Sequence, residues 1–119
     1  MKGTNGDDVL RGNDRDNDIF GLKGWDDLYG YRGSDYLNGG NGEDLLQGGK
    51  GRDLLEGGRG NDFLIGGNGD DDFWFATRNG FDIVNDFRAG DKLLIDVEDG
   101  GFEGVRRSDL AIDRGPKFD

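Results

Sequence analysis

A nine-residue unit is repeated eight times without a gap over residues 3–74. The first residue of the unit is glycine in all eight copies, and the fourth is glycine in seven. The sixth is aspartate in seven copies, and the eighth is a large apolar residue in all eight. A short exact period of this kind is typical of a solenoid, in which each unit buries its apolar residue against neighbouring units.

Each unit is predicted to be a turn followed by a short strand. Gly, Asn and Asp dominate its first six residues, and these residue types favour turns. The last three, such as 27–29, form a strand with the middle side chain inward. Two units then make one coil, so we expect an all-β fold, a right-handed parallel β-roll with two short parallel sheets and about four coils. This roll covers 1–74, and 75–119 is predicted to be a C-terminal β cap.

The eighth-position residues predict a core that is only two side chains wide. One stack is Leu10, Leu28, Leu46 and Leu64, and the other is Ile19, Leu37, Leu55 and Phe73. Burying one such side chain contributes roughly 1.5–3 kcal/mol, whereas ordering the backbone of one residue costs about 1–2 kcal/mol. Eight side chains cannot offset the ordering of the whole repeat, so another source of stability is required.

The acidic turns indicate what that source is. The chain has a formal net charge of -11, and stacked coils bring the sixth-position carboxylates next to one another. A divalent cation between successive turns would relieve this repulsion, and a flexible shell of carboxylate and backbone carbonyl oxygens suits Ca²⁺ better than Mg²⁺. Three gaps on each side of the roll predict about six calcium sites.

The predicted metal ligands are the sixth-position side chains, the fourth-position glycines of the same turns and two carboxylates of the cap. They are Asp8, Asn17, Asp26, Asp35, Asp44, Asp53, Asp62, Asp71, Gly6, Gly24, Gly33, Gly42, Gly51, Gly60, Gly69, Asp82 and Asp86. In the cap, Asp82, Asp86 and Asp91 are either calcium ligands or ordinary turn carboxylates, which are common.

The repeats GGNGED, GGKGRD, GGRGND and GGNGDD resemble the RTX calcium-binding nonapeptide repeats, which form a parallel β-roll. The segment DDFWFATRNGFDIVNDFRAGDKLLID is similar to the one that follows the repeats in serralysin-type proteases and alginate epimerase R-modules. The resemblance implies Ca²⁺ binding by the sixth-position carboxylates. It also implies type I secretion from a bacterium, with the chain unfolded inside the cell and folded outside on binding calcium.

Two departures from the repeat pattern qualify these expectations. The second unit has Arg15 in place of glycine and Asn17 in place of aspartate, so we expect the site between Asn17 and Asp35 to be weak or empty. The second position is Thr4, Asn13, Leu22 and Tyr31 in the first four units and glycine in the last four. The early turns should therefore be less regular than the later ones.

Composition excludes several functions. The absence of Cys and His excludes thiolate or imidazole metal sites and Cys-His or Ser-His catalysis. No other catalytic arrangement stands out, so we predict that the chain is not an enzyme by itself. Its acidity argues against nucleic acid as a partner, and its longest apolar run, 73–76, is too short to span a membrane. We expect a monomer or a module of a larger chain.

A glycan-binding module, similar to the epimerase R-modules, is the alternative function. Aromatic residues at outward strand positions could bind sugar rings, or they could reflect β-propensity and cover from another domain. The basic residues at the third position could bind an anionic polysaccharide, or they could balance the acidic turns locally. They are Lys23, Arg32, Lys50 and Arg59.

Overall fold

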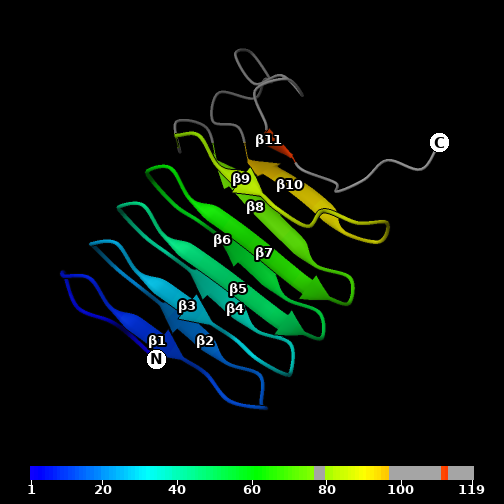
Figure 1. Ribbon diagram of the computed structural model, residues 1–119, viewed down its shortest axis with the longest axis horizontal. Coiled ribbons are helices and arrows are strands. Elements are labelled where there is room, and N and C mark those ends of the chain that lie inside the picture. Colours follow the sequence, from blue (N-terminus) through cyan, green and yellow to red (C-terminus); the bar gives the residue numbers. More distant parts are fainter. Residues whose placement is uncertain (77–79, 97–110, 113–119) are drawn as a thin grey trace.

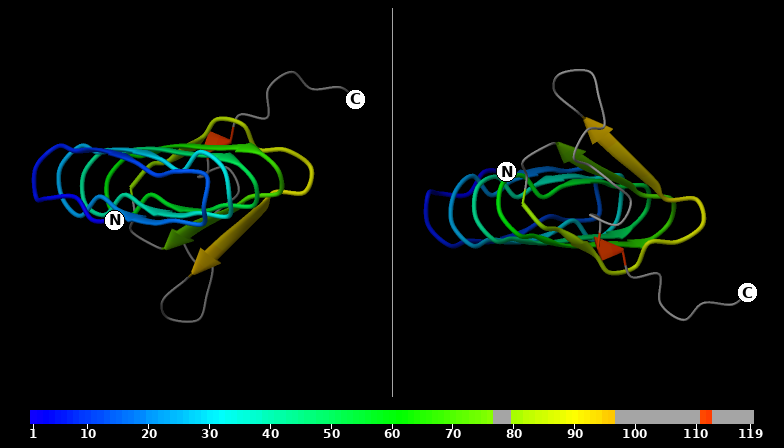
Figure 2. Two further views of the ribbon diagram at one scale, coloured as in Figure 1. Left: turned by 90° about the horizontal axis from the view of Figure 1, so that it is seen from below. Right: turned by 90° about the horizontal axis from the view of Figure 1, so that it is seen from above.

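The computed structural model describes residues 1–76, 80–96 and 111–112. Two parallel β-sheets face each other, and the chain alternates between them in a stack of flattened coils (Figures 1 and 2). Within each sheet, neighbouring described strands pair in parallel. The strand orders are β1-β3-β5-β7-β9-β11 and β10-β8-β6-β4-β2. The prediction of an all-β parallel roll is confirmed for the described part of the chain, in which every element is a strand.

The strands are short, as the repeat predicts. They are β1 (Val9–Arg11), β2 (Asp18–Phe20), β3 (Asp27–Tyr29), β4 (Tyr36–Asn38), β5 (Leu45–Lys50), β6 (Leu54–Glu56), β7 (Phe63–Asn68), β8 (Asp72–Ala76), β9 (Ile83–Val84), β10 (Lys92–Asp96) and β11 (Ala111–Ile112). Most strands within the repeat are the last three residues of a unit. In β5 and β7 the strand continues into the Gly-Gly pair of the next turn.

The core lies between the sheets and contains the two predicted stacks. Leu28, Leu46 and Leu64 pair in register in one sheet, and Ile19, Leu37, Leu55 and Phe73 in the other. All seven are fully buried. Leu10 is only partly buried because no coil of the described chain covers it on its outer side. Because each apolar residue packs against its counterpart in the next coil, one register fixes the whole stack.

The two sheets continue beyond the last nonapeptide. Val84 of β9 pairs with Leu64, and Leu93 of β10 pairs with Phe73, so the solenoid has about five turns rather than four. The offset between these partners is 20 residues, whereas it is 18 within the repeat. Figure 2 shows β8 and β10 diverging from the outline of the preceding coils. The remaining part of the predicted cap lies largely outside the described residues.

The second-position residues separate the first coil from the others. Leu22 and Tyr31 have φ angles of 78° and 70°, close to the 88° of Gly40 and Gly58 at the same position of later units. They therefore accept a left-handed backbone that residues with a Cβ rarely adopt. Thr4 and Asn13 do not have positive φ. The expected irregularity is thus confined to the first two turns.

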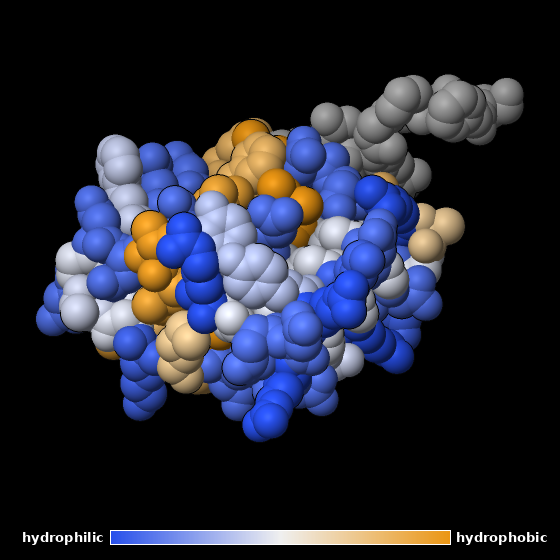
Figure 3. All heavy atoms as spheres, turned by 60° about the horizontal axis from the view of Figure 1, so that its bottom comes forward, coloured by the Kyte–Doolittle hydropathy of each residue, from blue (hydrophilic) through white to orange (hydrophobic). Residues whose placement is uncertain are grey.

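The face drawn in Figure 3 is predominantly hydrophilic, with hydrophobic residues gathered in a few places among charged ones. The described residues include no helix that is long and apolar enough to cross a membrane.

Candidate metal centres

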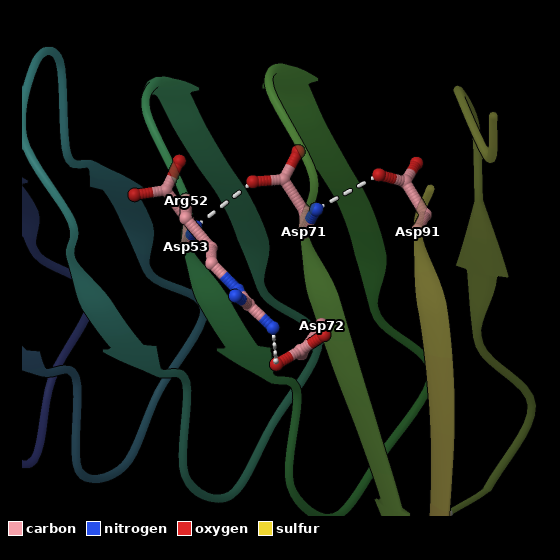
Figure 4. Close-up of polar contacts among 5 residues, drawn as sticks. All are labelled: Arg52, Asp53, Asp71, Asp72 and Asp91. Carbon is pink, nitrogen blue, oxygen red and sulfur yellow. Dashed lines mark hydrogen bonds and ion pairs between the residues drawn. The ribbon is translucent and has the colours of Figure 1, made fainter. Parts of the chain in front are cut away.

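The sixth-position carboxylates form two hydrogen-bonded ladders, one along each edge of the roll. In each ladder the Oδ1 of an aspartate accepts the backbone N–H of the sixth residue one coil earlier. One ladder runs from Asp8 through Asp26, Asp44 and Asp62, and the other from Asn17 through Asp35, Asp53 and Asp71. Each bond measures 2.7–2.9 Å between nitrogen and oxygen. Figure 4 shows the second ladder from Asp53 to Asp91.

The second oxygen of these carboxylates has no partner in six of the repeats. The Oδ2 atoms of Asp26, Asp35, Asp44, Asp53, Asp62 and Asp71 are buried and accept no hydrogen bond. The six residues are at most 4% exposed. A buried carboxylate oxygen without a donor or cation is costly, so six such atoms in a regular array indicate places where a cation belongs.

The first-position glycines leave room for these oxygens. A Cβ added to Gly30 would lie 2.5 Å from Asp35 Oδ2 and 2.6 Å from the carbonyl oxygen of Gly48 in the next coil. The corresponding distances at Gly48 are 2.5 Å to Asp53 Oδ2 and 2.8 Å to the carbonyl oxygen of Gly66. Glycine at this position therefore keeps open a cradle in which a carboxylate oxygen and a backbone carbonyl approach each other.

Burial raises the pKa values of the buried carboxyl groups in the ladders. Neighbouring carboxylates add to this rise, whereas the backbone hydrogen bonds of the ladders oppose it. The pKa of Asp44 and that of Asp53 rise to about 7, and that of Asp71 rises to about 8. The pKa values of Asp62 and Asp82 are also raised, with the two groups facing each other across one gap. Without a cation, the folded roll thus binds protons that an unfolded chain would release near neutral pH.

The donor set fits calcium. No group of three or more acidic side chains converges within the described residues, so a bound ion would need backbone carbonyl oxygens besides one or two carboxylates. Ca²⁺ accepts six to eight oxygen ligands in flexible geometry, including backbone carbonyls. Thiolate and imidazole are absent from the chain, which leaves only the hard oxygen ligands that Ca²⁺ prefers.

The fourth-position glycines lie in the same turns, stacked coil on coil. Gly24, Gly42 and Gly60 have φ angles of 103–117°, and their turns follow one another along one edge of the roll. A Cβ on Gly33 would lie 2.7 Å from the carbonyl oxygen of Arg15 in the preceding coil. This position thus brings the backbone of one turn close to a carbonyl oxygen of the preceding turn. The role of the fourth-position carbonyls as ligands stays a prediction.

Asp8 and Asn17, the sixth-position residues of the first coil, differ from the rest. The Oδ2 of Asp8 accepts the Thr4 backbone N–H at 2.6 Å and lies 3.0 Å from the Thr4 hydroxyl. The Oδ1 of Asn17 accepts the Asn13 backbone N–H at 2.9 Å, and its amide nitrogen donates to Asn13 Oδ1. Protein donors therefore occupy the oxygens that point into the turn.

The carboxylates beyond the repeat have divided roles. Asp82 continues the first ladder, because its Oδ1 accepts the Asp62 N–H. Asp86 instead accepts the backbone N–H groups of Gly66 and Gly67, one on each oxygen. Asp91 continues the second ladder from Asp71. From the sequence, Asp91 could be either a calcium ligand or a turn carboxylate, and its hydrogen bond to the Asp71 N–H is what puts it on the ladder.

A family model for the RTX calcium-binding nonapeptide repeat, which describes four copies, matches residues 2–37 and 38–73. The two matches cover 72 of the 119 residues and coincide with the regular part of the roll. A search of curated proteins found no match. The match and the array of buried carboxylates point to the same conclusion, that the chain belongs to the RTX calcium-binding nonapeptide repeat family.

Proposed function

We propose that this β-roll is a calcium-controlled folding module of a secreted protein, exported from a bacterium by type I secretion and folded outside the cell. The six unpartnered buried Oδ2 atoms are the observation that carries the proposal. A bound Ca²⁺ would supply positive charge and draw carboxylate and carbonyl oxygens of successive turns together. RTX repeats are typical of secreted proteins, which supports the extracellular setting.

The chain's own residues prepare the sites in two ways. Each Oδ1 holds the backbone N–H of the previous coil and so fixes the spacing of the turns. Each Oδ2 remains in the gap, where its charge opposes stacking as long as no cation is present. The unloaded chain is therefore destabilised in the turns, while the loaded chain gains stability at every gap, which makes folding depend on calcium.

We also propose that the segment 75–119 closes the roll and that the module has no catalytic activity of its own. The described part of this segment extends both sheets through β9 and β10, so it covers the core residues Leu64 and Phe73. The buried carboxylates are engaged in the ladders, which leaves them unsuited to acid–base chemistry on a substrate.

Limited trypsin digestion tests the folding proposal. The 15 Lys and Arg residues are distributed along the whole chain. With a chelator, the sites within 3–74 should be cleaved rapidly, and with Ca²⁺ they should be protected, while Mg²⁺ should protect much less. Equal protection of the repeat in chelator and in Ca²⁺ would show that calcium does not control folding.

Carbohydrate binding is a second candidate, supported by a groove on the outer face of the β3–β5–β7–β9 sheet. This open groove has a volume of about 510 Å³. Its apolar lining is Trp25, Leu45, Phe63, Phe81 and Ile83, and its polar lining includes Asp27, Glu43 and Asn61. Trp25 and Phe81 are 63% and 53% exposed, and aromatic faces beside hydrogen-bonding carboxylates suit sugar rings.

The groove favours a neutral sugar over the anionic polysaccharide predicted from the sequence. Its described lining carries carboxylates and no Lys or Arg, so an anionic ligand would be repelled there. Calorimetric titration of the calcium-loaded protein with neutral and with uronate oligosaccharides separates the two. Binding of the neutral series should be lost in Trp25→Ala and kept in Trp74→Ala, which alters the opposite sheet. No heat with either series would remove this candidate.

A further inference from the structure

We infer that the residue at the second position of each unit decides whether the turn can bind calcium, and that the first coil is closed to it. This inference rests on the proposed calcium binding and specifies which turns carry it out. The open sites would be those of the six carboxylates with an unpartnered Oδ2, and the closed ones those of Asp8 and Asn17.

The backbone of the second-position residue makes the difference. Leu22, at φ 78°, directs no hydrogen bond to the Oδ2 of Asp26, the carboxylate of its own turn, which stays unpartnered. Tyr31, at φ 70°, likewise leaves the Oδ2 of Asp35 free of hydrogen bonds. The later units achieve the same with glycine at φ 88–94°, as at Gly40 and Gly49. All six open sites lie in units three to eight, and in each of their turns the second-position residue has a left-handed backbone.

In the first two units the second residue is not left-handed, and its N–H points into the cradle. Thr4 N donates to Asp8 Oδ2 at 2.6 Å, and Asn13 N donates to Asn17 Oδ1 at 2.9 Å. The side chains strengthen this arrangement, because Thr4 Oγ1 accepts the Gly6 N–H and Asn13 Oδ1 accepts the Arg15 N–H. An oxygen that already accepts a short hydrogen bond from a backbone donor is a poor calcium ligand.

The remaining parts of a site are present in the first coil. A Cβ on Gly3 would lie 2.5 Å from Asp8 Oδ2 and 2.9 Å from the carbonyl oxygen of Gly21, so the same pair of oxygens meets there as at Gly30. The closed state of this turn is therefore a property of Thr4 and not of a missing ligand. The first coil would be held by protein hydrogen bonds alone, and it would end the calcium array on that side.

The test counts calcium ions by native mass spectrometry and calorimetry on the full 119-residue chain. The wild type should bind six ions, one for each unpartnered oxygen. Thr4→Gly should bind one more, because glycine adopts the left-handed backbone without strain. Thr4→Val is the matched control: it loses the hydroxyl, disfavours positive φ and keeps the backbone N–H, so its count should equal that of the wild type.

A second variant examines the other edge of the roll. Asn13→Gly combined with Asn17→Asp restores both the glycine and the carboxylate of the later units, and it should also add one ion. A wild type that binds no calcium would overturn the proposed function. If the wild type binds calcium but the ion counts are unchanged in both Thr4→Gly and the double variant, only the inference that the second-position residue decides calcium binding is overturned. Loss of β signal in Thr4→Gly alone leaves the double variant as the deciding measurement.

Discussion

The most informative single substitution is Asp44→Asn, because its effect should change sign with calcium. Asp44 Oδ1 accepts the Asp26 N–H at 2.8 Å, and its Oδ2 is buried without a partner. Asparagine keeps an oxygen for the first contact and removes the charge from the second. Its NH₂ group would then face the cradle, where the Gly57 carbonyl oxygen also lies.

The size of the stability change expected without calcium follows from the titration of the Asp44 carboxyl group. Burial raises the pKa of Asp44 from 3.8 to about 7, so the ionised form is disfavoured in the fold. At about 1.4 kcal/mol per pKa unit, the ionised Asp44 carboxylate opposes folding at pH 8 by at most a few kcal/mol. Asp44→Asn should therefore stabilise the calcium-free roll at pH 8. In saturating Ca²⁺ it should destabilise the roll, since one ligand is lost.

Circular dichroism can follow both arms of this prediction. In chelator, the calcium-free stability is measured by the concentration of an excluded osmolyte such as TMAO that folds half of the chains. This TMAO midpoint should be lower in the variant, because the variant is more stable without calcium. In Ca²⁺, the urea midpoint should fall instead. Asp14→Asn, an exposed change of the same charge, should move neither by a comparable amount. An Asp44→Asn variant that is less stable in chelator and unchanged in Ca²⁺ would refute the reasoning.

Three further predictions concern the core, the glycine cradle and pH. Leu46→Ala should lower the calcium-loaded unfolding free energy by about 2–5 kcal/mol, whereas Val9→Ala, at a 52% exposed position, should change it by less than about 0.5 kcal/mol; equal urea midpoints would contradict this. Gly30→Ala should cost about 1–3 kcal/mol and raise the calcium midpoint, whereas Gly6→Ala, whose Cβ would meet only Thr4 Oγ1 at 3.7 Å, should leave the midpoint near its wild-type value. In chelator, β signal should increase as pH falls from 8 towards 5. Carboxyl groups with raised pKa values bind protons in the folded state, so stability is lost as pH rises towards about 7. A decrease in β signal on acidification would contradict this.

The regular part of the roll could be predicted from sequence because one local rule recurs at every unit. The inward position of Leu28 and its partners follows from a period of nine and an alternating strand. The proposal that the sixth-position carboxylates bind calcium follows from the charge that stacking brings together. Neither inference needs contacts between distant and unrelated segments.

Other features depend on atomic detail that the repeat does not encode. Which oxygen of Asp35 accepts a hydrogen bond and which stays unpartnered depends on the turn geometry. The left-handed backbone at Leu22 and Tyr31 runs against their intrinsic preference, and it is imposed by the stack. The step of 20 residues after the last unit, which places Asp82 and Asp91 on the ladders, has no nonapeptide phase to reveal it.

The most direct test of the account is far-UV circular dichroism of the intact chain through a Ca²⁺ titration, with Mg²⁺ as control. Trp25, in a repeat turn, reports on the same transition by fluorescence, since its backbone N–H is held by Asp7 of the first coil. The account predicts a cooperative change from coil to β signal in about the 10⁻⁴–10⁻³ M range of extracellular calcium modules, and little change with Mg²⁺. Full β structure in excess chelator at neutral pH would contradict it, because the core and hydrogen bonds would then suffice without the cation.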